Sequence, residues 1–175
     1  MTERWYERLR EEYRPTSVRV LLIAESPPAS PIDNQRFFYS SVLTGHDNLF
    51  RGVALAAYGL GREDLARLGK DAVLRRLQAD GYWLIDAVDM PVNHLDGGHR
   101  RQLIDGSIPS LVPRAIAASP SVGAFICKAP IYERVAGPLR AAGVTVLNKG
   151  PAPFPLGNTR AEFVECWRRD ISDLG

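Results

Sequence analysis

The first apolar stretch of the chain, together with the prolines that follow it, constrains the fold most. Residues 18–24 (Val-Arg-Val-Leu-Leu-Ile-Ala) are typical of a strand buried in a sheet, and the next residue is Glu25. Pro27 and Pro28 stop the strand, because proline has no backbone N–H to donate to a sheet. We predict a central strand with a carboxylate at its carboxyl end, where open α/β sheets bind ligands. A Glu25 that caps the turn or pairs with a surface Arg is the alternative.

Apolar stretches and helical patterns alternate along the rest of the chain. Further strands are predicted at residues 82–88, 122–128 and 144–147, and helices at 48–58, 62–79, 107–118 and 130–143. A final helix is predicted to begin at the capping pattern of residues 159–162. Strands separated by helical crossovers form parallel sheets that helices cover on both faces. We therefore expect an α/β fold, a three-layer α/β/α sandwich around a four-stranded parallel sheet, with residues 1–175 in a single domain.

Three long loops follow predicted strands. They span residues 25–47, 89–106 and 148–158, and the first contains the aromatic run Phe37-Phe38-Tyr39. Loops this long inside a compact domain are usually functional when they are ordered. Because all three leave the carboxyl edge of a parallel sheet, we expect the binding site at that edge.

The composition excludes several classes of protein. The formal net charge is only +2, so no overall basic field indicates nucleic acid, although basic residues cluster locally at 75–76, 99–101 and 168–169. Two cysteines, Cys127 and Cys166, exclude a disulfide scaffold, a four-cysteine zinc site and a four-cysteine iron–sulfur cluster. The three histidines lack metal-ligand spacing, so we expect neither metal nor cofactor. Without a signal region or a membrane-length apolar run, a cytoplasmic location with no membrane contact is the expectation.

The order of the short motifs resembles that of the uracil-DNA glycosylase superfamily. Its first motif, of the type Gly-Glu-Ala-Pro-Gly, corresponds to residues 24–28 (Ala-Glu-Ser-Pro-Pro). Its second motif, often His-Pro-Ser before the final helix, corresponds to residues 154–158 (Phe-Pro-Leu-Gly-Asn). The resemblance implies a DNA glycosylase that flips a damaged or deaminated base out of the duplex and hydrolyses its N-glycosidic bond.

Residue roles follow from this resemblance. Glu25 would be the catalytic carboxylate that orients water and stabilises the positive charge on the sugar. Phe38 (or Phe37) would stack on the base, and Asp86 stands where the family has a strand-end Asn that reads the base edge. Core packing is the alternative for Phe38, and an Arg partner or a turn cap is the alternative for Asp86.

The second motif supplies the remaining candidates. Phe154 and Asn158 would contact the base, with a helix cap as the alternative for Asn158. Leu156 would fill the gap left by the flipped base, or simply pack. Lys128 and Lys149 would bind DNA phosphates, unless they face only water.

Three positions depart from the family pattern, namely Ala24, Asp86 and Phe154, where members have Gly, Asn and His. An ionised carboxylate only accepts hydrogen bonds, so Asp86 would suit a base with an exocyclic amine better than uracil, unless it is protonated. A catalytically degenerate nucleic-acid-binding module and a hydrolase of free nucleosides remain as alternatives.

Overall fold

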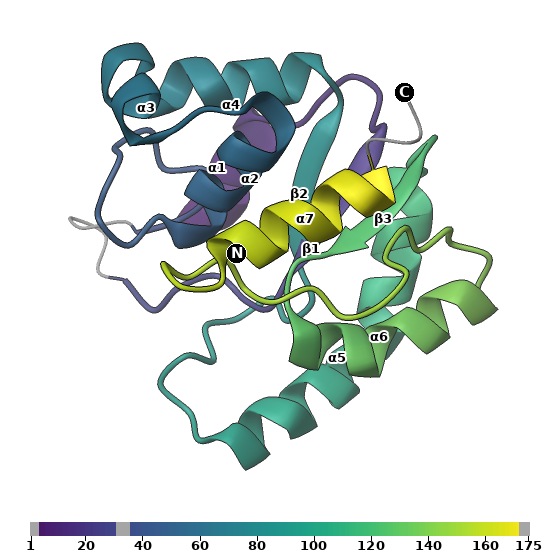
Figure 1. Ribbon diagram of the computed structural model, residues 1–175. Coiled ribbons are helices and arrows are strands. Elements are labelled where there is room, and N and C mark those ends of the chain that lie inside the picture. Colours follow the sequence, from purple (N-terminus) through teal and green to yellow (C-terminus); the bar gives the residue numbers. More distant parts are fainter. Residues whose placement is uncertain (1–3, 31–35, 172–175) are drawn as a thin grey trace.

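The computed structural model describes residues 4–30 and 36–171. Within them the chain alternates helices and strands around a parallel sheet (Figure 1). The elements are α1 (Trp5–Glu12), β1 (Val20–Ala24), α2 (Asn48–Tyr58), α3 (Arg62–Leu68), α4 (Lys70–Ala79), β2 (Tyr82–Asp86), α5 (Gly97–Ala118), β3 (Gly123–Ile126), α6 (Ala129–Ala141) and α7 (Arg160–Ile171).

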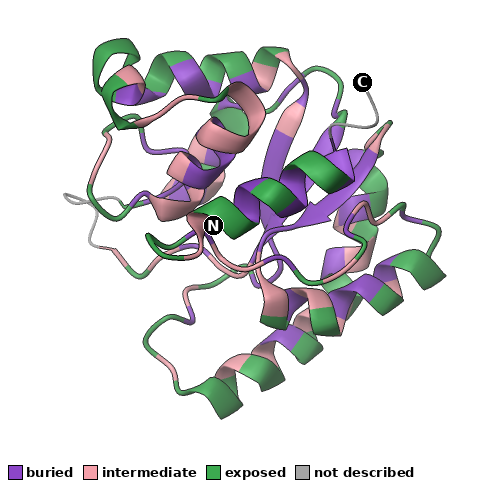
Figure 2. Ribbon diagram, in the orientation of Figure 1, coloured by how far each residue is buried: buried purple, intermediate pink, exposed green. Residues whose placement is uncertain are grey.

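The sheet has the order β2-β1-β3, and the predicted first strand is therefore its centre. All five residues of β1 are buried, as expected for a strand that is paired on both edges and covered on both faces (Figure 2). The register pairs Ala24 with Asp86 and Ile23 with Ile126. The three strands thus end together, and the residues that follow them share one edge of the sheet.

The predicted fourth strand is wrong in its extent. Residues 144–147 form a single bridge, in which Val146 pairs with Ala124, so the sheet of the described residues has three strands. The Asn148 side chain replaces the next rung, because its amide accepts from the Ile126 N–H at 2.7 Å and donates to the Ile126 carbonyl at 3.0 Å. The Asn148 side chain thereby satisfies the backbone N–H and carbonyl of Ile126 at the edge of β3, and the backbone pairing ends there.

Aromatic side chains of β2 and β3 pack against α7. Tyr82 and Phe125 lie on one face of the sheet by register, and both pack against Trp167 of α7, with ring centroids 5.6 and 5.4 Å apart. Figure 1 shows α7 crossing this face of the sheet. The same face carries Ala24 and Asp86 at the strand ends, so α7 covers one half of it and leaves the carboxyl edge to the loops.

Two helices differ from their predicted extents. The predicted helix over 62–79 is interrupted at Gly69, whose φ of +82° lies in the region that favours glycine, and it becomes α3 and α4. The helix predicted at 107–118 begins ten residues earlier, at Gly97, because the Asp96 side chain accepts hydrogen bonds from the N–H groups of Gly98 and His99. This N-cap places Arg100 in the first turn of α5, beside the carboxyl edge of the sheet.

The loop of residues 148–158 contains the second motif and is called the second-motif loop below. It packs directly on α2. A Cβ atom on Gly52 would lie 2.5 Å from the Pro155 Cβ, so only glycine permits this approach. The contact fixes the loop over the sheet edge and points Phe154 toward the site.

Candidate functional site

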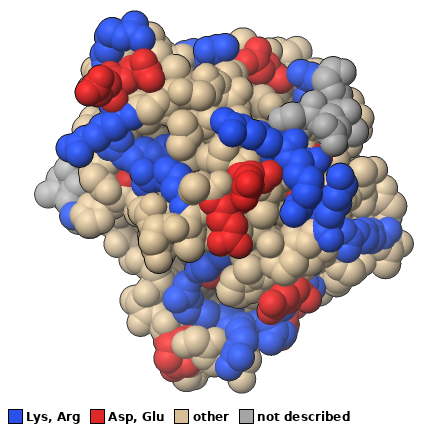
Figure 3. Space-filling view, in the orientation of Figure 1, with Lys and Arg blue, Asp and Glu red and all other residues tan. Residues whose placement is uncertain are grey.

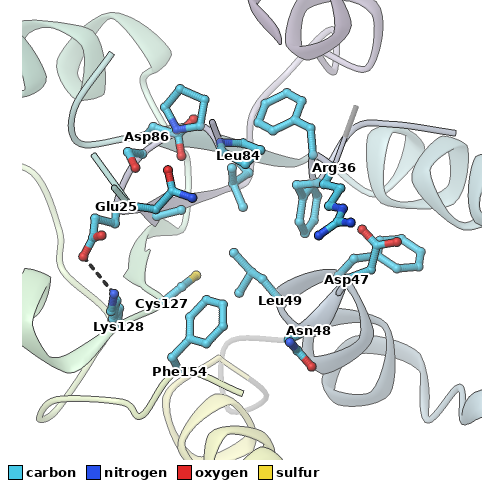
Figure 4. Close-up of a pocket in the computed structure, with 18 of the residues that line it drawn as sticks. Glu25, Arg36, Asp47, Asn48, Leu49, Leu84, Asp86, Cys127, Lys128 and Phe154 are labelled. Carbon is cyan, nitrogen blue, oxygen red and sulfur yellow. Dashed lines mark hydrogen bonds and ion pairs between the residues drawn. The ribbon is translucent and has the colours of Figure 1, made fainter. Parts of the chain in front are cut away.

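A cavity of about 260 Å³ lies at the carboxyl edge of the sheet. Its floor is made by strand-end residues, and its walls come from the loop after β1, the start of α2 and the second-motif loop. Figure 4 shows Glu25 and Lys128 at one end, Arg36 and Asp47 at the other, and Phe154 between them. A cavity therefore lies at the edge of the sheet where the sequence predicts the site.

Glu25 lies at one end of the cavity in an ion-pair cluster. Lys128 Nζ is 2.8 Å from one carboxylate oxygen, and the Arg100 guanidinium donates to the other. Burial acts to raise the pKa of Glu25, but hydrogen bonds from Lys128 and Arg100 outweigh it and hold the pKa below its ordinary value. Glu25 is thus ionised at neutral pH and is a weak base. The local charge of the three groups sums to +1.

Asp86 forms part of the cavity lining and is also an ion-pair partner. Its Oδ2 accepts from Arg10 Nη2 at 2.5 Å, and both side chains are almost fully buried. Among the described residues, the hydrogen bond to the Asp86 side chain is the one on Oδ2. Burial raises the pKa of this carboxyl to about 6, against the opposing effect of Arg10. The alternative interpretation of Asp86, as the partner of an Arg, is thus confirmed, and the same carboxyl lies in the cavity lining.

The aromatic run forms one wall of the cavity. Phe37 and Phe38 both line it, and Phe38 packs edge-on against Tyr39 and Phe50 at centroid distances of 5.0 and 5.9 Å. Phe38 is 9% exposed, so most of its surface belongs to the core and one part faces the cavity. Tyr39 anchors the run to the sheet, because its hydroxyl is 2.6 Å from the Leu84 backbone nitrogen.

A buried ion pair holds the opposite end of the cavity. The Lys70 side chain is fully buried, and its Nζ donates to Asp47 Oδ1 at 2.9 Å and to the Phe37 carbonyl at 2.8 Å. Burial lowers the pKa of Lys70, and Asp47 opposes this effect. Lys70 therefore ties the aromatic wall to the start of α2.

The second-motif residues divide into two groups. Phe154 lines the cavity, and Lys128 Nζ lies 5.9 Å from the centre of its ring. Asn158, Lys149 and Leu156 do not line the cavity. All three are exposed, Leu156 to 48%. The structure thus brings Glu25, Phe38, Asp86, Phe154 and Lys128 together and leaves the other three candidates at the surface.

Several lining residues were missed by the sequence analysis. Arg100 belongs to a noted basic cluster, but only the Asp96 N-cap shows that it faces the sheet edge. Asn93, from the loop after β2, accepts a hydrogen bond from the Ala29 N–H at 3.1 Å and joins two of the long loops. Both fall in the predicted loop over residues 89–106, which follows a strand, and that position was the available signal, although Arg100 in fact belongs to α5.

The described residues contain no group of three His, Cys, Asp or Glu side chains that would hold a metal ion. Likewise, none of the helices found there combines the length and the apolar character needed to cross a membrane. Comparison with protein-family models, with curated proteins and with solved structures gave no match.

Proposed function

We propose that this protein binds a nucleotide flipped out of DNA and hydrolyses the N-glycosidic bond of its damaged or deaminated base. The observation that carries the proposal is an ionised carboxylate, Glu25, at the end of a cavity walled by Phe37, Phe38 and Phe154. The cavity volume is just below the range of about 300–1,000 Å³ typical of sites for drug-sized ligands, which suits a single base.

Glu25 would act on the sugar rather than on the base. Water oxygen forms a bond to C1′, the N-glycosidic bond breaks, and its electron pair leaves with the base, which takes up a proton from water. Because the pKa of Glu25 is lowered, its role is to orient the water and to stabilise the oxocarbenium-like charge, not to take a proton early.

Lys128 and Arg100 would bind the phosphates on either side of the flipped nucleotide. In the free protein their charges are directed at Glu25 and oppose any cation that forms beside it. Two DNA phosphates would draw them away and restore the negative field of the carboxylate. Binding of the strand and activation of Glu25 are thereby coupled.

Asp86 would select the base. At neutral pH most of the Asp86 carboxyl is ionised and Oδ1 offers only an acceptor, which fits an exocyclic amine. Below about pH 6 the protonated form becomes the major one and presents an O–H to a carbonyl. The proposed substrate at neutral pH is therefore a damaged base that retains an amino group, and a deaminated base, which carries a carbonyl instead, would be read by the protonated form at lower pH.

Replacing Glu25 with Gln should lower base release by about 100-fold or more, because the amide cannot supply the negative charge. The test is strand scission by alkali after incubation with oligonucleotides that carry uracil, hypoxanthine, xanthine, 5-substituted uracils or normal bases, in single and double strands. Glu165→Gln, an exposed position on α7, is the matched control. Equal scission by Glu25→Gln and the control would remove Glu25 from the mechanism.

The second candidate function is a nucleic-acid-binding module without catalysis. One observation favours it: both carboxylate oxygens of Glu25 already accept hydrogen bonds from cations. Tight binding to DNA that carries a flipped or abasic site, with no scission of any oligonucleotide, would establish this alternative. The absence of both scission and DNA binding would favour the third function, hydrolysis of free nucleosides.

Phe38→Leu should weaken binding to abasic-site DNA by about tenfold while affecting plain duplex little, because a leucine fills the space without a stacking face. Phe163→Leu, a buried substitution in α7 away from the cavity, is the control for general loosening of the core. Fluorescence anisotropy with the two DNA types measures both losses. Equal losses for the two DNA types would assign Phe38 to the core alone.

A further inference from the structure

A second cavity, of about 350 Å³, lies beside α2, and its lining combines three arginines with three leucines and two glycines, without an aromatic residue. Arg51, Arg62 and Arg160 come from α2, α3 and α7 and converge on it. Figure 3 shows Lys and Arg side chains gathered over the part of the surface where these helices meet. No acidic side chain is among the residues that line it.

Two of the three arginines have neutral partners, and none of the three is paired with a carboxylate of the described residues. Arg51 donates to the Thr44 carbonyl at 3.0 Å, and Arg160 donates to the Asn48 amide oxygen at 3.2 Å. Arg62 is exposed at the rim of the cavity, and the buried Arg160 Nε has no acceptor among the described residues. Elsewhere in the molecule Arg75 and Arg134 are each paired with a carboxylate.

Three guanidiniums around one cavity repel one another and have no carboxylate beside them, so an anion bound among them would be stabilised by all three charges. Guanidinium groups present planar pairs of N–H donors that match phosphate oxygens. We propose that this second cavity is a binding site for a phosphate group. Arg62 would contact it from the rim, while Arg51 and Arg160, held by Thr44 and Asn48, would form its fixed wall.

The position of the cavity indicates where the phosphate comes from. Asn48 lines the first cavity and Arg51 lines the second, so the two are separated by one turn of α2. Asn48 also holds Arg160. A nucleic-acid strand with one nucleotide in the first cavity would pass the second, and its backbone is the expected source of the phosphate; a free phosphate ester is the other source.

The test compares Arg62→Gln with Arg67→Gln. Arg67 is on the same helix, its side chain is 70% exposed, and it pairs with Asp64 outside the cavity. Inorganic phosphate at several times its Kd should raise the Tm of the unmodified protein and of Arg67→Gln by about 2–4 °C over chloride at equal ionic strength. This gain should be lost in Arg62→Gln. The comparison between variants removes the general stabilising effect of phosphate as a salt.

Binding of an oligonucleotide identifies the source. For a backbone phosphate, Arg62→Gln should lower affinity several-fold and reduce the slope of log K against log salt by about one, with no such change in Arg67→Gln. Loss of the phosphate response alone, with unchanged oligonucleotide binding, would assign the site to a free phosphate ester. Equal behaviour of both variants in both measurements would overturn the proposal, and Arg160→Gln provides a second variant of the same site.

This inference does not require base release. Glu25→Gln should retain the Arg62-dependent response to phosphate. If no oligonucleotide is cleaved and the phosphate response persists, the glycosylase proposal fails while the phosphate site stands.

Discussion

Arg10→Met should lower the free energy of unfolding by about 3–5 kcal/mol at neutral pH. Arg10 is the partner of the Asp86 carboxylate in an almost fully buried pair, with 2.5 Å between Nη2 and Oδ2. Without it, Asp86 is left with a buried negative charge or must take up a proton. Arg8→Met, at an exposed position on the same helix, should change the free energy by no more than about 0.5 kcal/mol. Urea unfolding followed by circular dichroism measures both.

The loss of unfolding free energy in Arg10→Met, called the deficit below, should depend on pH in a defined direction. Burial already raises the pKa of Asp86 to about 6, and removing Arg10 takes away the main effect that opposes the rise. For a carboxyl with a raised folded pKa, the stabilising contribution is complete below its unfolded pKa of about 4 and is lost as the pH rises through the folded value. The deficit should therefore be larger at about pH 8 than at about pH 5. A deficit that does not change over this range would show that removing Arg10 leaves the pKa of Asp86 unchanged.

A double variant separates the ion pair from its packing. Arg10→Met combined with Asp86→Leu replaces two buried charges with apolar groups of similar size and should restore most of the lost stability. The double variant removes the Oδ1 acceptor from the cavity, so we expect it to be folded but altered in base preference. A double variant as unstable as Arg10→Met would mean that Arg10 acts through contacts other than Asp86.

Lys70→Met should also cost about 3–5 kcal/mol, because it leaves the buried Asp47 carboxylate without its cation. The Phe37 carbonyl loses its donor in the same change, so the aromatic wall should loosen from the start of α2. Urea unfolding gives the global cost, and amide hydrogen exchange of residues 37–50 reports the local effect.

Lys149→Met, at an exposed lysine outside the cavity, is the matched control for Lys70→Met. It should leave both unfolding and exchange close to those of the unmodified protein. Faster exchange in residues 37–50 should accompany weaker binding of abasic-site DNA if the wall serves the site. A global loss of stability with unchanged local exchange would contradict the role of Lys70 as an anchor of this wall.

Local sequence patterns predicted the elements that form the sheet. Residues 18–24 are apolar and end at two prolines, and β1 lies there at the centre of the sheet. Side chains that face a fully covered sheet must be apolar, so this signal is carried by the strand itself. The fourth strand was overestimated because Asn148 replaces backbone pairing with a side-chain amide, which no periodicity shows.

The position of the cavity was predicted, and its lining residues were predicted only in part. Glu25 and Phe38 were found because each lies next to a strong local signal, a strand end and an aromatic run. Arg100 required the N-cap at Asp96, which extended α5 toward the sheet edge. Asn158, Leu156 and Lys149 lie outside the cavity, since Gly52 and Pro155 fix the loop with only Phe154 turned inward.

By itself, the sequence determined the central strand, the sheet edge that holds the cavity, and the carboxylate placed there. Only the tertiary structure decided the charge state around it. Glu25 meets Arg100 and Lys128 across 75 and 103 residues of chain, and Asp86 meets Arg10 across 76. Strand and helix patterns arise from neighbours along the chain, whereas ion pairs depend on which helices pack beside the sheet. Whether Glu25 or Asp86 is ionised is therefore a property of the packed molecule.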